Sequence, residues 1–232
     1  MSRFAHVKVC GVTSIEDARG CVAAGVRSIG LNFVPTSPRF VDRALARRIV
    51  ESLPSSIVTV AVVADLPRDE LAALLSETGI RCLQLHGEEP PELVAAFLPH
   101  AYKALRVADA RDVARADDYP GDYLLVDARI EGKLGGTGAR VDPSLVAPLA
   151  ARRRLALAGG LTPENVADAI AAVRPFAVDV ASGVERPGDP RRKSLDAVRA
   201  FVAAVRAVAS ARRLAETAPF LTEDRARSTV KR

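Results

Sequence analysis

Tryptophan is absent from this 232-residue chain, and aromatic residues make up only 4% of it. Apolar residues reach 49%, so a core has to be packed mainly by Ala, Val and Leu. Such residues suit helices and buried parallel strands. The length fits one large α/β barrel as well as two smaller domains.

Cysteine and histidine are scarce, with three of each. The cysteines are Cys10, Cys21 and Cys82, an odd and sparse set that argues against a disulfide framework and for a reducing compartment. No C-x-x-C pair occurs, and the histidines lack metal-ligand spacing. We therefore predict no structural zinc and no other metal site.

Long hydrophobic runs are missing, and the initial stretch MSRFAHVKV has no hydrophobic signal region. The net charge is only +5, and the basic clusters RRR (152–154) and RRK (191–193) lack interleaved aromatics. They are interpreted as solvated surface, or as a means of attracting an anionic substrate, rather than as a nucleic-acid site. We expect a soluble, cytoplasmic protein without nucleic-acid or membrane partners. The sequence leaves open whether it is a monomer or a homodimer.

Short apolar runs, bounded by Gly, Pro or polar residues, recur along the chain as expected of buried parallel strands. Eight can be counted: 6–10, 28–34, 57–64, 81–87, 101–107, 122–128, 154–160 and 176–183. Alanine-rich helical segments separate them. This alternation predicts a single (β/α)₈ TIM barrel over residues 1–213, with an open doubly wound sheet as the alternative. Residues 214–232 lose the periodicity and are predicted to be a C-terminal extension.

Helix start and stop signals support this division. Thr13 or Ser14 is a candidate N-cap for the first helix. Pro67 marks the start of a later helix and Gly79 its end. In TPENVADAIAAV, Thr162 is the expected cap, with the proline after it at the first helical position.

Polar residues stand at the carboxyl ends of several predicted strands, where a barrel of this kind forms its active site. Cys10 ends the first strand, Gln84 and His86 the fourth, and Asp127 the sixth. Residues two apart share a face of a strand, so Gln84 pairs with His86, and Lys8 pairs with Cys10. Both pairs are predicted to point into the barrel mouth.

Structural roles compete with chemical ones at each of these positions. A lone buried cysteine is most often a small hydrophobe, so position alone favours packing over catalysis for Cys10. Asp127 fits equally well as a cap for its loop or as a functional carboxylate. His86 fits a polar group at the rim better than a proton-transfer group.

Glycines follow the last two predicted strands. LALAGGLTPENV places Gly159 and Gly160 after the seventh strand, and VDVASGVE places Asp179 on the eighth, followed by Ser182 and Gly183. Backbone N–H groups in such loops can cradle a phosphate dianion. The GGTG stretch (135–138) is a candidate third wall or lid.

Seven motifs in this order resemble the phosphoribosylanthranilate isomerase family of tryptophan biosynthesis. They are KVCGVT, SPRF, LQLHG, LLVDA, GGTG, LAGGLTPENV and VDVASGVE, and the match runs from about Val7 to Phe201. The resemblance implies Cys10 as general base, Asp127 as general acid and Arg39 as the group that holds the anthranilate carboxylate. It also implies a phosphate cradle at Gly159, Gly160, Ser182 and Gly183, with Gln84, His86 and Asp179 lining the substrate pocket.

The implied reaction is an Amadori rearrangement of an aminoaldose to an aminoketose, which needs one acid, one base and no cofactor. Cys10 then needs help to become a thiolate, and Lys8 is a candidate. Two rivals remain. A related isomerase of histidine biosynthesis has Asp at the end of the first strand, where Cys10 stands here. A non-catalytic paralogue that binds a sugar phosphate needs neither Cys10 nor Asp127.

Overall fold

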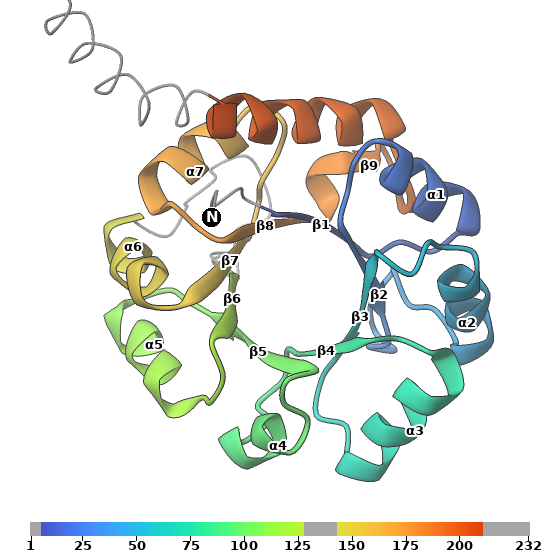
Figure 1. The fold of residues 1–232 in the computed structure, drawn as a ribbon, viewed down its shortest axis with the longest axis horizontal. Helices are drawn as coiled ribbons and strands as arrows, with labels where there is room; N and C mark the ends of the chain where they lie inside the picture. Colours follow the sequence, from blue (N-terminus) through green and yellow to red (C-terminus); the bar gives the residue numbers. More distant parts are fainter. Residues whose placement is uncertain (1–5, 128–142, 211–232) are drawn as a thin grey trace, which may run out of the picture.

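The computed structural model describes residues 6–127 and 143–210, which form a closed barrel of eight parallel strands surrounded by helices (Figure 1). The strands are β1 (His6–Cys10), β2 (Ser28–Asn32), β3 (Val58–Val63), β4 (Cys82–Leu85), β5 (Ala101–Arg106), β6 (Tyr123–Asp127), β7 (Arg154–Ala158) and β8 (Ala177–Val180). The helices are α1 (Ile15–Ala23), α2 (Arg43–Glu51), α3 (Arg68–Thr78), α4 (Pro91–Ala96), α5 (Ala110–Ala114), α6 (Pro143–Arg152) and α7 (Val166–Val173), and a last helix spans 195–210. The predicted TIM barrel is confirmed, and the open sheet is excluded because β1 pairs with β8.

Local sequence signals explain most helix boundaries. Ser14 caps α1, since its side chain accepts a hydrogen bond from the N–H of Asp17 at 3.1 Å. Helix α3 follows Pro67 and ends at Gly79, whose φ of 69° is the left-handed conformation that favours glycine. Both ends of α3 lie where the sequence predicts them.

The predicted start of α7 is wrong by a few residues. Residues 163–165 form a turn, and Asn165 rather than Thr162 precedes the first helical residue, Val166. The Asn165 side chain stabilises the turn through two hydrogen bonds. Its Oδ1 accepts from the N–H of Thr162 at 3.0 Å, and its Nδ2 donates to the carbonyl of Gly160 at 2.9 Å. A side-chain amide that bonds the backbone of two preceding residues competes with a regular first helical turn.

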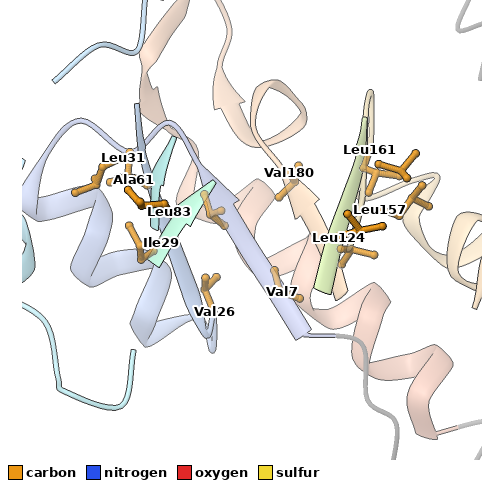
Figure 2. Close-up of a cluster of buried hydrophobic side chains, with 14 of the residues drawn as sticks. Val7, Val26, Ile29, Leu31, Ala61, Leu83, Leu124, Leu157, Leu161 and Val180 are labelled. Atoms are coloured by element: carbon orange, nitrogen blue, oxygen red, sulfur yellow. The ribbon is translucent and has the colours of Figure 1, made fainter. Parts of the chain in front are cut away.

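Alternate residues of the strands face two separate cores. Outward-facing residues such as Val7, Ile29, Leu83 and Val180 pack against the helices in the larger core, part of which is seen in Figure 2. Inward-facing residues make a second, smaller cluster inside the barrel: Val60, Tyr102, Ala104, Leu125, Ala156, Ala158 and Ala177. The same alternation turns polar side chains of the strands into the barrel.

A short two-stranded hairpin between β8 and the last helix was not predicted. It consists of β9 (Glu185–Arg186) and β10 (Asp189–Lys193), and it follows the 3₁₀ turn η2 (Ser182–Val184). Lys193, at the end of β10, is fully buried. The hairpin brings charged residues back to the mouth of the barrel.

The last helix packs on the barrel through Val198, Phe201, Val202 and Val205, all buried. The predicted C-terminal extension (214–232) and the GGTG stretch (135–138) lie outside the described residues. Within the described ranges, no helix has the length and apolar character needed to cross a bilayer.

Candidate active site

The predicted polar strand ends meet in one pocket at the carboxyl end of the barrel. Of the ten site residues predicted from sequence, nine line it; only Gly183 does not. The lining consists of Cys10, Asn32, Arg39, Val62, Gln84, His86, Leu125, Asp127, Ala158, Gly159, Gly160, Leu161, Asp179, Ala181 and Ser182. A thiol, a carboxylate and glycine loops from distant parts of the chain therefore share one concave site.

Cys10 packs closely against the neighbouring strand. It lies in register with Gly30, and a Cβ added at Gly30 would stand only 2.9 Å from its Sγ. Because Gly30 has no side chain, there is space for the Cys10 thiol at this position. Burial raises the pKa of the Cys10 thiol above its ordinary value, which Lys8 opposes. Position therefore gives Cys10 access to the pocket but does not by itself make it a thiolate.

Lys8 faces the barrel interior, as predicted, but lies beneath the pocket and does not line it. Its Nζ donates to Asp179 Oδ2 at 2.7 Å and to Gln84 Oε1 at 2.9 Å. Tyr102, a residue that the sequence did not single out, also donates to Gln84 Oε1, at 3.0 Å. The ion pair raises the pKa of Lys8 in spite of its burial, so the ammonium stays charged.

Gln84 links this group to His86. Because Gln84 Oε1 accepts from two donors, its Nε2 is the atom that faces His86, and it lies 3.2 Å from Nδ1. Burial lowers the pKa of His86 to about 4, so the ring is neutral at pH 7. With Nδ1 accepting, the proton sits on Nε2, which lies 3.8 Å from Asp127 Oδ2. At that distance Nε2 donates no hydrogen bond to any described residue, and a neutral His86 fits a polar group at the rim rather than a base.

Arg39 lies in the loop after β2 and is held by a carboxylate that sequence reasoning missed. Its Nε and Nη2 donate to the two oxygens of Glu185 at 2.6 and 2.9 Å. Lys193 donates to Glu185 Oε1 at 2.9 Å as well. One edge of the guanidinium is thereby fixed, and the side chain lines the pocket. The only sequence signal for Glu185 is its place directly after the SGV turn.

The glycine loops after β7 and β8 lie against each other. A Cβ at Gly183 would stand 2.0 Å from the carbonyl oxygen of Leu161, so only glycine fits there. Gly159 and Gly160 have φ values of 98° and 62°. Within residues 6–127 and 143–210, the N–H groups of Gly160 and Gly183 donate no hydrogen bond. They are available to an anion such as phosphate.

In the part of the chain that the structure describes, no group of three or more His, Cys, Asp or Glu side chains could hold a metal ion. The pocket combines a thiol, the carboxyl groups of Asp127 and Asp179, a cation and an anion cradle. This set suits proton transfer on a substrate that carries both a phosphate and a carboxylate.

Comparison with known proteins agrees with the geometry. Residues 7–204 match the family described as N-(5′-phosphoribosyl)anthranilate (PRA) isomerase. A relative of that name from Pseudomonas paraeruginosa is 45% identical over 203 residues, covering 87% of this chain and 95% of the relative. Another, from Symbiobacterium thermophilum, is 40% identical and covers 88% and 99% of the two chains.

Solved structures are similar as well. The phosphoribosylanthranilate isomerase of Thermotoga maritima superimposes with a TM-score of 0.79 at 38% identity, covering 88% of this chain and 99% of that one. A phosphoribosylanthranilate isomerase solved in complex with reduced 1-(o-carboxyphenylamino)-1-deoxyribulose 5-phosphate gives a TM-score of 0.78 at 37% identity, with the same coverage.

Proposed function

Since the chain belongs to the N-(5′-phosphoribosyl)anthranilate isomerase family and catalyses that isomerisation in tryptophan biosynthesis, we propose that Cys10 is its general base and Asp127 its general acid. The observation that carries the assignment is that both side chains open into one pocket together with Arg39 and the glycine loops. The substrate is phosphoribosylanthranilate, and the product is 1-(2-carboxyphenylamino)-1-deoxyribulose 5-phosphate.

Two proton transfers carry the substrate to an enolamine. Asp127 protonates the ring oxygen while the C1–O bond of the furanose breaks and the nitrogen lone pair forms the iminium. The Cys10 thiolate then removes the proton from C2, and those electrons move toward nitrogen to give an enolamine. The enolamine tautomerises to the ketone. Lys8 with Gln84 orients His86, whose Nε2 faces the Asp127 carboxylate at 3.8 Å, beyond hydrogen-bond length.

The substrate's two anionic ends fit the two ends of the pocket. The phosphate would lie on the loops of Gly159, Gly160, Ser182 and Gly183, with their N–H groups as donors. The anthranilate carboxylate would bind Arg39, pre-oriented by Glu185. Gln84 and Asp179 line the pocket beside the sugar.

Rival functions are disfavoured by particular residues. The histidine-pathway isomerases that the fold resembles use Asp at the end of the first strand, and Cys10 stands there. A barrel that only binds a sugar phosphate has no use for a thiol and a carboxylate facing the same cavity. Turnover of phosphoribosylanthranilate by the purified chain, followed by chromatography of the product, tests both rivals.

Arg39→Ala is expected to weaken binding of the anthranilate half of the substrate. A charge-assisted, bidentate contact to a carboxylate is lost, and a loss of roughly 10- to 100-fold in affinity is expected. Calorimetry compares a product analogue that has the aryl carboxylate with one that lacks it. Only the analogue that has the carboxylate should bind more weakly to Arg39→Ala than to the wild type.

Arg43→Ala is the matched control, because Arg43 is an exposed arginine that pairs with Glu70 and Glu77 on α3. It should leave both affinities unchanged. Equal weakening of the two analogues by Arg39→Ala would refute the assignment of Arg39 to the carboxylate.

The pH dependence of kcat/KM should be bell-shaped, with its alkaline limb set by Cys10. Below the carboxyl pKa both groups are protonated and no base is present. Above the thiol pKa both are ionised and no acid is present. Between the two pKa values, a constant minor fraction of the enzyme molecules has the proton on Asp127 and not on Cys10, and this fraction is the active form. Because burial raises the pKa of Cys10, the alkaline limb should lie at a higher pH than for an ordinary cysteine thiol.

Cys10→Ser serves as the control for this profile. A serine hydroxyl does not titrate in the accessible range, so the alkaline limb should disappear from the residual activity. If the same limb persists in Cys10→Ser, it belongs to another group and the base assignment fails.

We place the reaction in the cytoplasm, where sparse free thiols such as Cys10, Cys21 and Cys82 persist. A monomer or a homodimer stays our prediction for the oligomeric state.

A further inference from the structure

Lys8 and Asp179 form a buried ion pair next to the proposed base. Their charged atoms lie 2.7 Å apart, and the two side chains are 5% and 6% exposed. The pair joins neighbouring strands, because Lys8 of β1 is in register with Asp179 of β8. Since the pair is net neutral, Asp179 offsets part of the field that Lys8 exerts on its surroundings.

Asp179, which lines the pocket, keeps an unused acceptor. Its Oδ1 is buried and accepts no hydrogen bond from any described residue, while the residue lines the pocket. A buried carboxylate oxygen without a donor is costly, and a ligand hydroxyl can supply the missing hydrogen bond.

Cys10 lies within the field of this pair. Its Sγ and the Cε of Lys8 both lie within 3.2 Å of the position that a Cβ on Gly30 would take. Two further cations act on the thiol, Lys193 at the end of β10 and Arg39 in the loop after β2. Lys8 and Lys193 act to lower the pKa of Cys10, whereas Asp179 acts to raise it. The carboxylate therefore opposes the thiolate that the reaction needs.

We propose that Asp179 couples sugar binding to the charge state of Cys10 through Lys8, which makes Lys8 and Asp179 positioning residues for the base. A sugar hydroxyl that donates to Asp179 Oδ1 stabilises the carboxylate's charge and weakens its hold on Lys8. The ammonium then acts more strongly on Cys10, whose thiol proton leaves to water. The empty pocket keeps the thiol protonated. This inference rests on the proposed role of Cys10 as base.

The test is a pH titration of the Cys10 thiolate by its ultraviolet absorbance, with Cys10→Ser subtracted as the blank. Burial raises the pKa of Cys82 to about 11 and that of Cys21 to about 12. These two thiols therefore stay protonated in the pH range where Cys10 is titrated, and they add no thiolate absorbance. Ribulose 5-phosphate is the probe, because it offers hydroxyls and a phosphate without an absorbing ring. Inorganic phosphate, which fills the phosphate cradle but brings no sugar hydroxyl, is the matched control ligand.

In the wild type, saturating ribulose 5-phosphate should lower the apparent pKa of Cys10 by about one unit, a tenfold gain in thiolate. Inorganic phosphate should not. Asp179→Asn keeps the shape but removes the charge, and Lys8→Met removes the cation; both should abolish the ligand-induced fall. Lys8→Met should also raise the pKa of free Cys10. Calorimetry on each variant sets the saturating concentration, and melting curves verify folding.

Three results would overturn the coupling: no fall in the wild type, an equal fall with inorganic phosphate, or an equal fall in Asp179→Asn. Turnover of phosphoribosylanthranilate by the wild type is measured in parallel. Turnover without the fall refutes this inference and leaves the proposed function standing, whereas a fall without turnover refutes the proposed function alone.

Discussion

Cys10→Ala removes nearly all turnover of phosphoribosylanthranilate while the product still binds. Losing a general base typically costs about 10²- to 10⁴-fold in rate. The phosphate loops and Arg39 are separate from the thiol, so ground-state binding has little reason to change. Steady-state kinetics measure the loss in kcat, and calorimetry measures product affinity. The substitution removes one small side-chain atom, so the protein should melt at nearly the wild-type temperature.

Cys82→Ala is the matched control for this experiment. Cys82 also faces the barrel interior, where it packs against the inner apolar cluster, but it does not line the pocket. Its removal should leave kcat unchanged. If Cys10→Ala retains wild-type turnover, or if Cys82→Ala loses as much, then Cys10 is not the base.

Asp127→Asn has a comparably large expected effect, through the other half of the reaction. Asparagine keeps the size and polarity of the side chain and its place 3.8 Å from His86, but it cannot donate a proton to the ring oxygen. We expect kcat to fall by about 10²- to 10⁴-fold with product affinity nearly intact. Single-turnover measurements under saturating substrate separate this loss from any change in product release.

Asp122→Asn controls for the loss of a carboxylate near the same strand. Asp122 is exposed and precedes β6, at the end of the barrel opposite the pocket. Its variant should turn over at the wild-type rate. Full activity in Asp127→Asn would show that another group is the general acid.

The barrel could be predicted from sequence because each strand has its own local sequence signal. Each apolar run between glycines or prolines predicts a strand by itself, and the count of eight decides the architecture once β8 closes on β1. The same holds for Cys10, Gln84 and Asp127, since polar groups at strand ends share one rim by geometry alone. Residue roles needed more than position, and they came from the resemblance to a family.

Features made by long-range pairing could not be predicted. Glu185 binds Arg39, which lies 146 residues away in sequence, and no local sequence pattern near either residue predicts this ion pair. Lys8 acts on Cys10 as the sequence predicts, because it lowers the pKa of the thiol. The hydrogen bonds of its ammonium to Asp179 and Gln84, on strands far away in sequence, could not be predicted. The start of α7 differs from the prediction because the Asn165 amide bonds the backbone of Thr162 and Gly160, an interaction that helix-capping patterns do not encode.

The central claim is that this chain isomerises phosphoribosylanthranilate with Cys10 as base. Its most direct test is growth of a tryptophan auxotroph that lacks this isomerase, complemented either by the wild-type chain or by Cys10→Ala at matched expression. We predict growth without tryptophan for the wild type and none for Cys10→Ala. Growth with both would contradict the role of Cys10, and growth with neither would contradict the function itself.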